Sequence, residues 1–157
     1  LIIPGLYGYV SATKWLSELE VTTWEGFDGY WVPLGWSKTG PILTQSRIDV
    51  PKHNAKVPAG PTAVAGVAWA PDRGISAVEV KVDEGSWQAA TADPSTTAKY
   101  GWKFYTYNWA GATPGEHTIV SRVTDTNGMV QPTEKELENK KTFLEDNSQH
   151  PRKLTIA

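Results

Sequence analysis

The sequence predicts an all-β protein, built as a β-sandwich, and three observations lead to that prediction. First, its 157 residues include 14 glycines and 11 prolines scattered along the chain, which is typical of a protein with many tight turns. Second, from residue 41 onward, short apolar runs alternate with turn signals at the spacing expected of a sandwich. Third, 39% of the residues are hydrophobic and 8 are tryptophans, which is enough apolar material for a folded core.

The expected strands follow one another after residue 41. Residues 75–82 are the clearest, because Val78 and Val80 alternate with more polar positions and so share one face. A turn at residues 83–85 joins this strand to residues 87–91 in a hairpin. The other expected strands are residues 42–50, 62–70, 102–109, 117–125 and, as a last edge strand, 154–156. The tryptophans that we expect in the core of these strands are Trp69, Trp87, Trp102 and Trp109.

Residues 1–40 have a different character from the rest of the chain. Residues 1–3 have the pattern of a strand end, and the alternation of residues 15–22 predicts a strand. Residues 24–36 are rich in aromatic side chains that follow no period. Such a segment cannot build a core alone, so we expect it to pack on a partner surface, with sugar stacking as the alternative. Since the chain begins in an apolar run, we expect it to be part of a longer polypeptide.

Composition excludes several classes of function. A formal net charge of −2 gives no electrostatic footprint for nucleic acid. The chain has no cysteine, and His53, His117 and His150 lie apart without the spacing of metal ligands. Residues 133–146 carry a charge run in which Thr133 and Glu136 stand at capping-box spacing, which predicts either a short helix or a solvated loop.

Three segments carry recognisable motifs. Residues 4–16 contain a Pro-Gly loop followed by Lys-Trp-Leu. Residues 66–87 join Gly-Val-Ala-Trp to an arginine loop and to a strand that closes on a Gly-Ser-Trp turn. Residues 102–131 end in an Arg-x-x-Asp-x-x-Gly-x-x-Gln run. Together and in this order, they resemble the sulfite oxidase family of molybdopterin-dependent oxidoreductases: the first is similar to the end of the family's cofactor domain, and the last to its closing strands.

The resemblance implies that residues 1–40 are the end of an α+β molybdopterin-binding domain with its linker, and that residues 41–157 are an immunoglobulin-like dimerisation domain. The parent enzyme would transfer oxygen atoms in two-electron steps at a molybdenum–molybdopterin cofactor. The family's metal-ligating cysteine lies upstream, so we expect neither catalysis nor a bound cofactor in this fragment alone. Expected partners are a second copy, the missing catalytic domain of the same polypeptide and a small oxyanion or oxide substrate.

The resemblance also assigns roles to individual residues. It places Arg73 in the substrate pocket, where a guanidinium can bind an oxyanion in a bidentate manner, and Lys14 and Ser11 at the cofactor. If the resemblance does not extend to these roles, Arg73 is a turn arginine in water or paired with Asp72, and Lys14 is an exposed lysine at a strand start. The similarity of residues 27–31 to a bacterial branch with N-terminal membrane helices predicts an extracytoplasmic, membrane-anchored parent.

Two other functions compete with this hypothesis. The tryptophans and the lack of catalytic residues also suit a stand-alone sandwich that binds carbohydrate or another cell-surface ligand. A purely structural oligomerisation domain, without any role in a pocket, is the third possibility.

Overall fold

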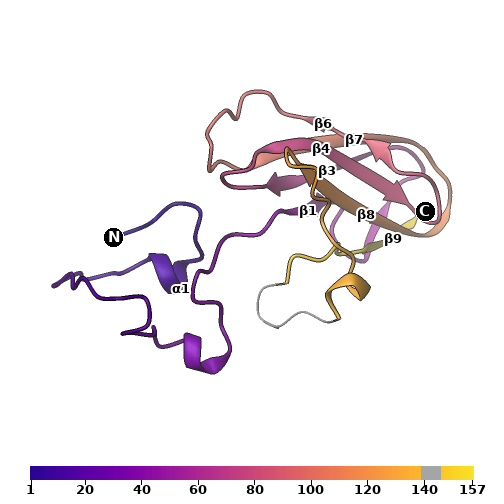
Figure 1. The fold of residues 1–157 in the computed structure, drawn as a ribbon. Helices are drawn as coiled ribbons and strands as arrows, with labels where there is room; N and C mark the ends of the chain where they lie inside the picture. Colours follow the sequence, from indigo (N-terminus) through magenta and orange to yellow (C-terminus); the bar gives the residue numbers. More distant parts are fainter. Residues whose placement is uncertain (139–145) are drawn as a thin grey trace.

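The computed structural model describes residues 1–138 and 146–157, and within them two β-sheets pack face to face (Figure 1). One sheet has the strand order β1-β3-β7-β6 and the other β2-β9-β8-β4-β5. The strands are β1 (Gln45–Val50), β2 (Ala55–Val57), β3 (Gly60–Trp69), β4 (Ile75–Val82), β5 (Gln88–Ala89), β6 (Thr91–Ala92), β7 (Lys103–Ala112), β8 (Gly115–Asp125) and β9 (Arg152–Ile156). The predicted all-β sandwich is therefore confirmed.

The core lies between the sheets and is built from alternate residues of the long strands. In β4, Val78 and Val80 are buried, as the alternation predicts. The other apolar core side chains are Ile48, Val64, Ala68, Tyr105, Trp109, Ala112, Ile119, Val123, Leu154 and Ile156.

The prediction that four strand tryptophans lie in the core is correct only for Trp109. Trp69 and Trp102 stack on each other outside the sandwich, with ring centroids 5.5 Å apart, and Trp102 is 53% exposed. Trp87 instead lies under the guanidinium of Arg122, 4.2 Å from the ring centroid. A large ring satisfies strand propensity on either face of a sheet, so propensity alone did not assign the face.

Two strand assignments differ from the expectation. Residues 87–91 do not form one strand, because β5 pairs with β4 in one sheet and β6 pairs with β7 in the other. The last strand, β9, is not at an edge: it lies between β8 and β2, and pairs with β2 in parallel. The three residues of β2 were missed because so short a run shows no period.

Residues 1–40 lie beside the sandwich and carry only short helical turns, α1 (Gly8–Ser11) and the 3₁₀ helix η1 (Val32–Leu34) (Figure 1). The strand expected at residues 15–22 is wrong: these residues form no strand, and Trp15 is 96% exposed with φ of +53°. Ile2 makes an isolated β-bridge with Ala12. A strand at residues 15–22 would need a neighbour for its backbone groups, and the described residues supply none.

The capping box at the start of residues 133–146 is present. The backbone N–H of Thr133 donates to Glu136 Oε2 at 2.7 Å, and the N–H of Glu136 donates to Thr133 Oγ1 at 3.4 Å. It opens only a 3₁₀ turn, η2 (Lys135–Leu137), and residues 139–145 lie outside the described residues. No helix in the described ranges is long and apolar enough to cross a membrane.

Candidate functional site

The arginine loop connects β3 to β4 at one end of the sandwich. The backbone N–H groups of Arg73 and Gly74 both donate to the carbonyl of Ala70, at 3.2 and 2.8 Å, which closes a tight turn. Gly74 has φ of +77°, a conformation that glycine adopts without strain. Asp72 is also left-handed, with φ of +64°, as short polar residues in turns sometimes are. This turn directs Arg73 toward the edge of the core.

The guanidinium of Arg73 is anchored to the sandwich rather than to its neighbour Asp72. Its Nε lies 3.3 Å from Asp125 Oδ2 and donates to Thr44 Oγ1 at 3.1 Å, while Nη2 donates to the carbonyl of Ile42 at 2.9 Å. Asp125 is 0% exposed and the arginine side chain 26% exposed. No hydrogen bond from Nη1 is recorded within residues 1–138 and 146–157, so part of the fork remains available.

Asp125 is the acceptor that organises the turn after β8. Its Oδ1 accepts from the backbone N–H groups of Asn127 and Met129, both at 3.0 Å. Gly128, within this turn, has φ of +82°. The turn therefore explains why the Arg-x-x-Asp-x-x-Gly-x-x-Gln run has an aspartate and a glycine at these positions. Its aspartate, Asp125, also pairs with Arg73 of the arginine loop.

The run ends in a buried glutamine that ties several segments together. Gln131 Oε1 accepts from the backbone N–H of Ser46 at 2.9 Å and from its hydroxyl at 2.7 Å. The amide Nε2 donates to the carbonyl of Ser148 at 2.8 Å, and Ser46 Oγ lies 3.0 Å from Ser121 Oγ. Because these polar groups are buried, their mutual hydrogen bonds are what makes them tolerable in the core.

A cavity of about 380 Å³ lies beside Arg73, at the end of the sandwich. Three cationic side chains and one carboxylate line it: Arg73, Lys99, Lys103 and Asp72. Asp72 Oδ1 accepts from the hydroxyl of Tyr100 at 2.9 Å and lies 2.8 Å from Lys99 Nζ. The hydrogen bond from Lys99, followed by that from Tyr100, lowers the pKa of Asp72, and the same ion pair raises the pKa of Lys99.

The two residues expected at a cofactor differ in their surroundings. Ser11 is buried at the end of α1, and its hydroxyl donates to the carbonyl of Leu6 at 3.2 Å. Lys14 is exposed, and no partner of its ammonium is recorded among the described residues. A free ammonium fits an anionic pterin phosphate, whereas the Ser11 hydroxyl proton is already committed to its own loop. The structure records no contact between Arg73 and either residue.

The Pro-Gly loop nevertheless touches the arginine loop. A Cβ placed on Gly5, which has φ of +86°, would lie 2.8 Å from Asp72 Oδ2 and 3.1 Å from a ring carbon of Tyr100. Tyr7 donates its N–H to the carbonyl of Gly40 at 2.7 Å, and Ile42 donates to Gly5 at 2.9 Å. Residues 4–7 are thus held against the end of the sandwich that carries Arg73.

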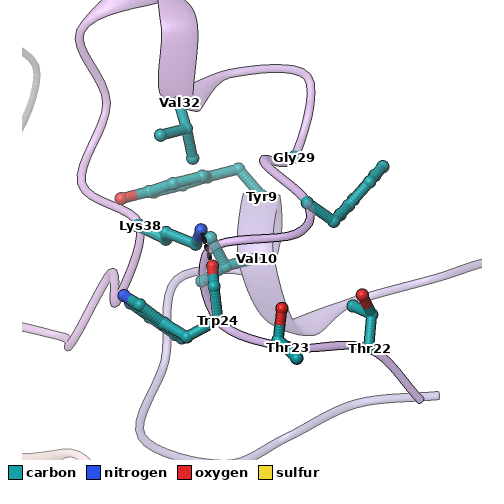
Figure 2. A pocket seen from close by; sticks show the side chains of 9 residues that line it. Tyr9, Val10, Thr22, Thr23, Trp24, Gly29, Val32 and Lys38 are labelled. Atoms are coloured by element: carbon teal, nitrogen blue, oxygen red, sulfur yellow. Dashed lines mark hydrogen bonds between the residues drawn. The ribbon is translucent and has the colours of Figure 1, made fainter.

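The aromatic segment encloses a second cavity of about 360 Å³, shown in Figure 2. Lys38 lies over the ring of Trp24, donates to the backbone carbonyl of Trp24 and pairs with Asp28 at 2.6 Å. The rings of Tyr9 and Trp36 meet edge to face at 65°, and those of Trp31 and Trp36 are tilted by 48°. These rings pack into one another at an angle instead of presenting one flat stacking surface, which favours an interface over a sugar platform.

Sequence reasoning missed Lys99, Tyr100 and Lys103. Lys103 carried a usable signal, because it shares the inward-facing positions of β7 with Tyr105 and Trp109. Lys99 and Tyr100 lie in a loop without any period, so the sequence held no signal for them. No cluster of three or more potential metal ligands occurs within the described ranges.

The two packed sheets define the class of this chain as an immunoglobulin-like β-sandwich. The family model for the Mo-co oxidoreductase dimerisation domain matches residues 40–150. The chain belongs to this family, which confirms the resemblance to the C-terminal part of sulfite-oxidase-type enzymes. A search of the curated proteins finds no match.

The fold is shared with a solved structure. The sulfane dehydrogenase SoxCD from Paracoccus pantotrophus is similar over 76% of this chain and 33% of that chain, with a TM-score of 0.65 and 20% identity. This chain therefore spans about a third of that protein's chain. The fibronectin(III)-like modules of CbhA from Clostridium thermocellum match 71% of this chain and 94% of theirs, with a TM-score of 0.45 and 16% identity.

Proposed function

We propose that this chain is the C-terminal part of a sulfite-oxidase-like molybdenum-cofactor oxidoreductase, supplying dimer contacts and part of the cofactor and substrate pocket. The observation that carries the proposal is the family match over residues 40–150. The contact between the Pro-Gly loop and the arginine loop supports it, because it joins the segment expected at the cofactor to the segment expected at the substrate. A boundary between the cofactor-domain remnant and the sandwich near residue 40 is supported by the start of the family match at residue 40 and of the first strand at Gln45.

Each residue has a defined task in the proposed pocket. The molybdenum–pterin group, when bound, supplies two-electron oxygen-atom transfer. Arg73 binds the oxyanion through the part of its fork that Asp125 and Ile42 leave available, since those partners fix the guanidinium plane. Lys14 neutralises the pterin phosphate, and Ser11 holds the loop through its bond to Leu6. Holding Arg73 in one orientation lowers the entropic cost of binding the substrate.

The experiment is to express the complete gene, measure molybdenum by elemental analysis and determine the steady-state kinetics of Arg73→Ala. We expect molybdenum in the native protein and a rise in KM of about tenfold in the variant, because an ionic hydrogen bond to the substrate is lost. Lys56→Ala, which removes an exposed cation from β2 in the other sheet, is the control. Matured protein without molybdenum contradicts the proposal. An unchanged KM indicates a purely structural oligomerisation domain.

We further propose that a second copy of this chain binds the outer face of the sheet β1-β3-β7-β6. This face carries Trp69, Trp102 and Phe104, the last 57% exposed. Arg47 and Asp49 form an ion pair at its margin, with Nε 2.8 Å from Oδ1. A surface with one cation beside one anion is complementary to itself across a two-fold axis. By contrast, the tryptophan ring on the outer face of the other sheet, that of Trp87, lies under the guanidinium of Arg122, which pairs with Glu79.

Sedimentation of the full enzyme tests this face. Phe104→Glu places an unpaired carboxylate in the apolar part of the proposed interface, so we expect a monomer where the native protein is a dimer. Thr124→Glu, on the outer face of the other sheet, is the matched control and should leave the dimer intact. A dimer that survives Phe104→Glu contradicts the choice of face.

We also propose an extracytoplasmic location with an N-terminal membrane anchor, supported by the resemblance of residues 27–31 to a bacterial branch of the family. Fractionation of cells that express the complete gene is the test. Recovery in the soluble cytoplasmic fraction contradicts it.

A further inference from the structure

Lys103 occupies an inward-facing position at the start of β7. Along this strand, Tyr105 and Trp109 point into the core, and Lys103 shares their side. Its partner across the sheet is Ala68, which is buried. A lysine on the core face of a sandwich requires compensation for its charge, because desolvation penalises an unpaired ammonium.

The structure gives Lys103 a polar contact but no ion pair among the described residues. Its Nζ donates to the backbone carbonyl of Thr96. Asp93 is close enough for the charge of Lys103 to contribute to its lowered pKa, after the larger effect of hydrogen bonds from Ser95. The Asp93 carboxylate is nevertheless held by the Ser95 N–H at 2.8 Å, and among the described residues Lys103 forms no ion pair.

The other charges around the cavity are already matched. Asp72 is satisfied by Lys99 and Tyr100, and Arg73 lies against the buried Asp125. Among the cations that line the cavity, Lys103 is therefore the one that forms no ion pair in the described part of the chain, although its charge interacts with that of Asp93. It lines the same 380 Å³ cavity as Arg73.

We infer that this cavity is an oxyanion site in which Lys103 is a second binding residue, in addition to Arg73. The ligand class is a small sulfur or phosphorus oxyanion, for which Arg73 supplies a planar fork and Lys103 a compact point charge. Lys99 and Tyr100 act as positioning residues, because Lys99 balances the charge of Asp72, whose carboxylate would otherwise repel the anion, and Tyr100 donates a hydrogen bond to it. The inference deepens the proposed function and rests on it for the role of Arg73 in a substrate pocket.

The test is a titration of the 157-residue chain with sodium sulfate at constant ionic strength, with sodium chloride as the reference anion. Backbone amide shifts in NMR spectra report binding, and we expect saturable shifts at Gly74 and Gly101, which line the cavity. Lys103→Gln should weaken sulfate binding about tenfold, because it removes one charge-assisted contact. Lys103→Arg keeps the charge and should bind within about threefold of the native chain.

Lys56→Gln is the matched control, since Lys56 is an exposed strand lysine in the other sheet and remote from the cavity lining. It should bind sulfate as the native chain does. Sulfate shifts no larger than those of chloride, or equal affinities for Lys103→Gln and the native chain, overturn the inference. Since this titration needs no molybdenum, its failure is distinguishable from failure of the proposed function, which molybdenum analysis of the full enzyme reports.

Discussion

His117 Nδ1 lies 2.7 Å from Asp83 Oδ2, and the opposite ring nitrogen, Nε2, lies 2.8 Å from the carbonyl oxygen of Thr113. Both neighbours accept hydrogen bonds, so the contacts are complete only when both ring nitrogens carry protons. The charged imidazolium joins the turn after β4 to the turn before β8. The hydrogen bond to Asp83 is the main cause that raises the pKa of His117 above its usual value of 6.5.

The pair predicts a pH-dependent contribution to stability. The raised pKa of His117 means that its contribution is complete below pH 6.5 and is lost as pH rises through the folded-state value. Partial burial opposes the shift of Asp83, but hydrogen bonds from His117 and the Thr118 N–H lower its pKa below 3.8, so its contribution is lost only in acid. Both contributions are therefore present between pH 3.8 and 6.5.

We expect the free energy of unfolding in urea to fall from pH 5.5 to pH 8.5 by up to about 1 kcal/mol, since Asp83 is partly exposed and screened. His117→Gln should lack this pH-dependent part. Replacing His150, for which the structure records no ion pair, by glutamine should preserve it. Equal pH dependence of the native and His117→Gln chains contradicts the prediction.

The buried carboxylate of Asp125 should be more important for stability than any exposed acid. Asp125→Ala removes the partner of Arg73 and the acceptor of two backbone N–H groups, so we expect a loss of about 2–4 kcal/mol in urea unfolding. Asp125→Asn retains an acceptor oxygen and should lose less. Asp49→Ala, in an exposed pair, should change stability by under about 1 kcal/mol. Similar losses for Asp125→Ala and Asp49→Ala would show that the contacts of the Asp125 carboxylate contribute little to the free energy of unfolding.

The close approach of a neighbouring strand explains why the Gly-Val-Ala-Trp motif begins with a glycine, Gly66. A Cβ at this position would lie 1.9 Å from the carbonyl oxygen of Arg47 on the neighbouring strand. Since a Cβ is fixed in place by its own backbone and the oxygen belongs to the backbone of the neighbouring strand, the clash cannot be relieved by a side-chain rotation. We expect Gly66→Ala to lower the free energy of unfolding by more than about 3 kcal/mol. Gly111→Ala, also in a strand but facing open space, should be close to neutral; an equal loss in both would refute the explanation.

Strand periodicity predicted those parts of the fold that local pattern determines, and it failed where a distant partner decides. Val78 and Val80 are buried as expected, because a two-residue period is visible in a single strand. On the outer face, Trp102 packs against Trp69 and Arg47 from other strands, and local sequence does not show these partners.

The same reasoning applies to the candidate site. The resemblance identified Arg73, but its partner Asp125 lies in a different motif, and only the packing of the turn after β3 against the turn after β8 brings the two together. By contrast, the alternation of residues 102–109 already places Lys103 on the same face as Tyr105 and Trp109, so the charge on the inner face of β7 could be predicted from the sequence.

The contact between Gly5 and Asp72 predicts that residues 4–7 can be detached without unfolding the sandwich. Gly5→Ala introduces a side chain at φ of +86° and 2.8 Å from Asp72 Oδ2, which costs about 1–3 kcal/mol locally. The amides of Tyr7 and Ile42, which donate to Gly40 and Gly5, should then exchange with deuterium at least about fivefold faster. Because β4 and β8 make no such contact, their amides should exchange as in the native chain.

Gly8→Ala, whose Cβ would meet only Ala12 at 3.8 Å, is the control and should leave all these rates unchanged. Unchanged exchange at Tyr7 and Ile42 in Gly5→Ala would mean that the loop is not held by this close approach, and the link between the expected cofactor and substrate segments would lose its structural support.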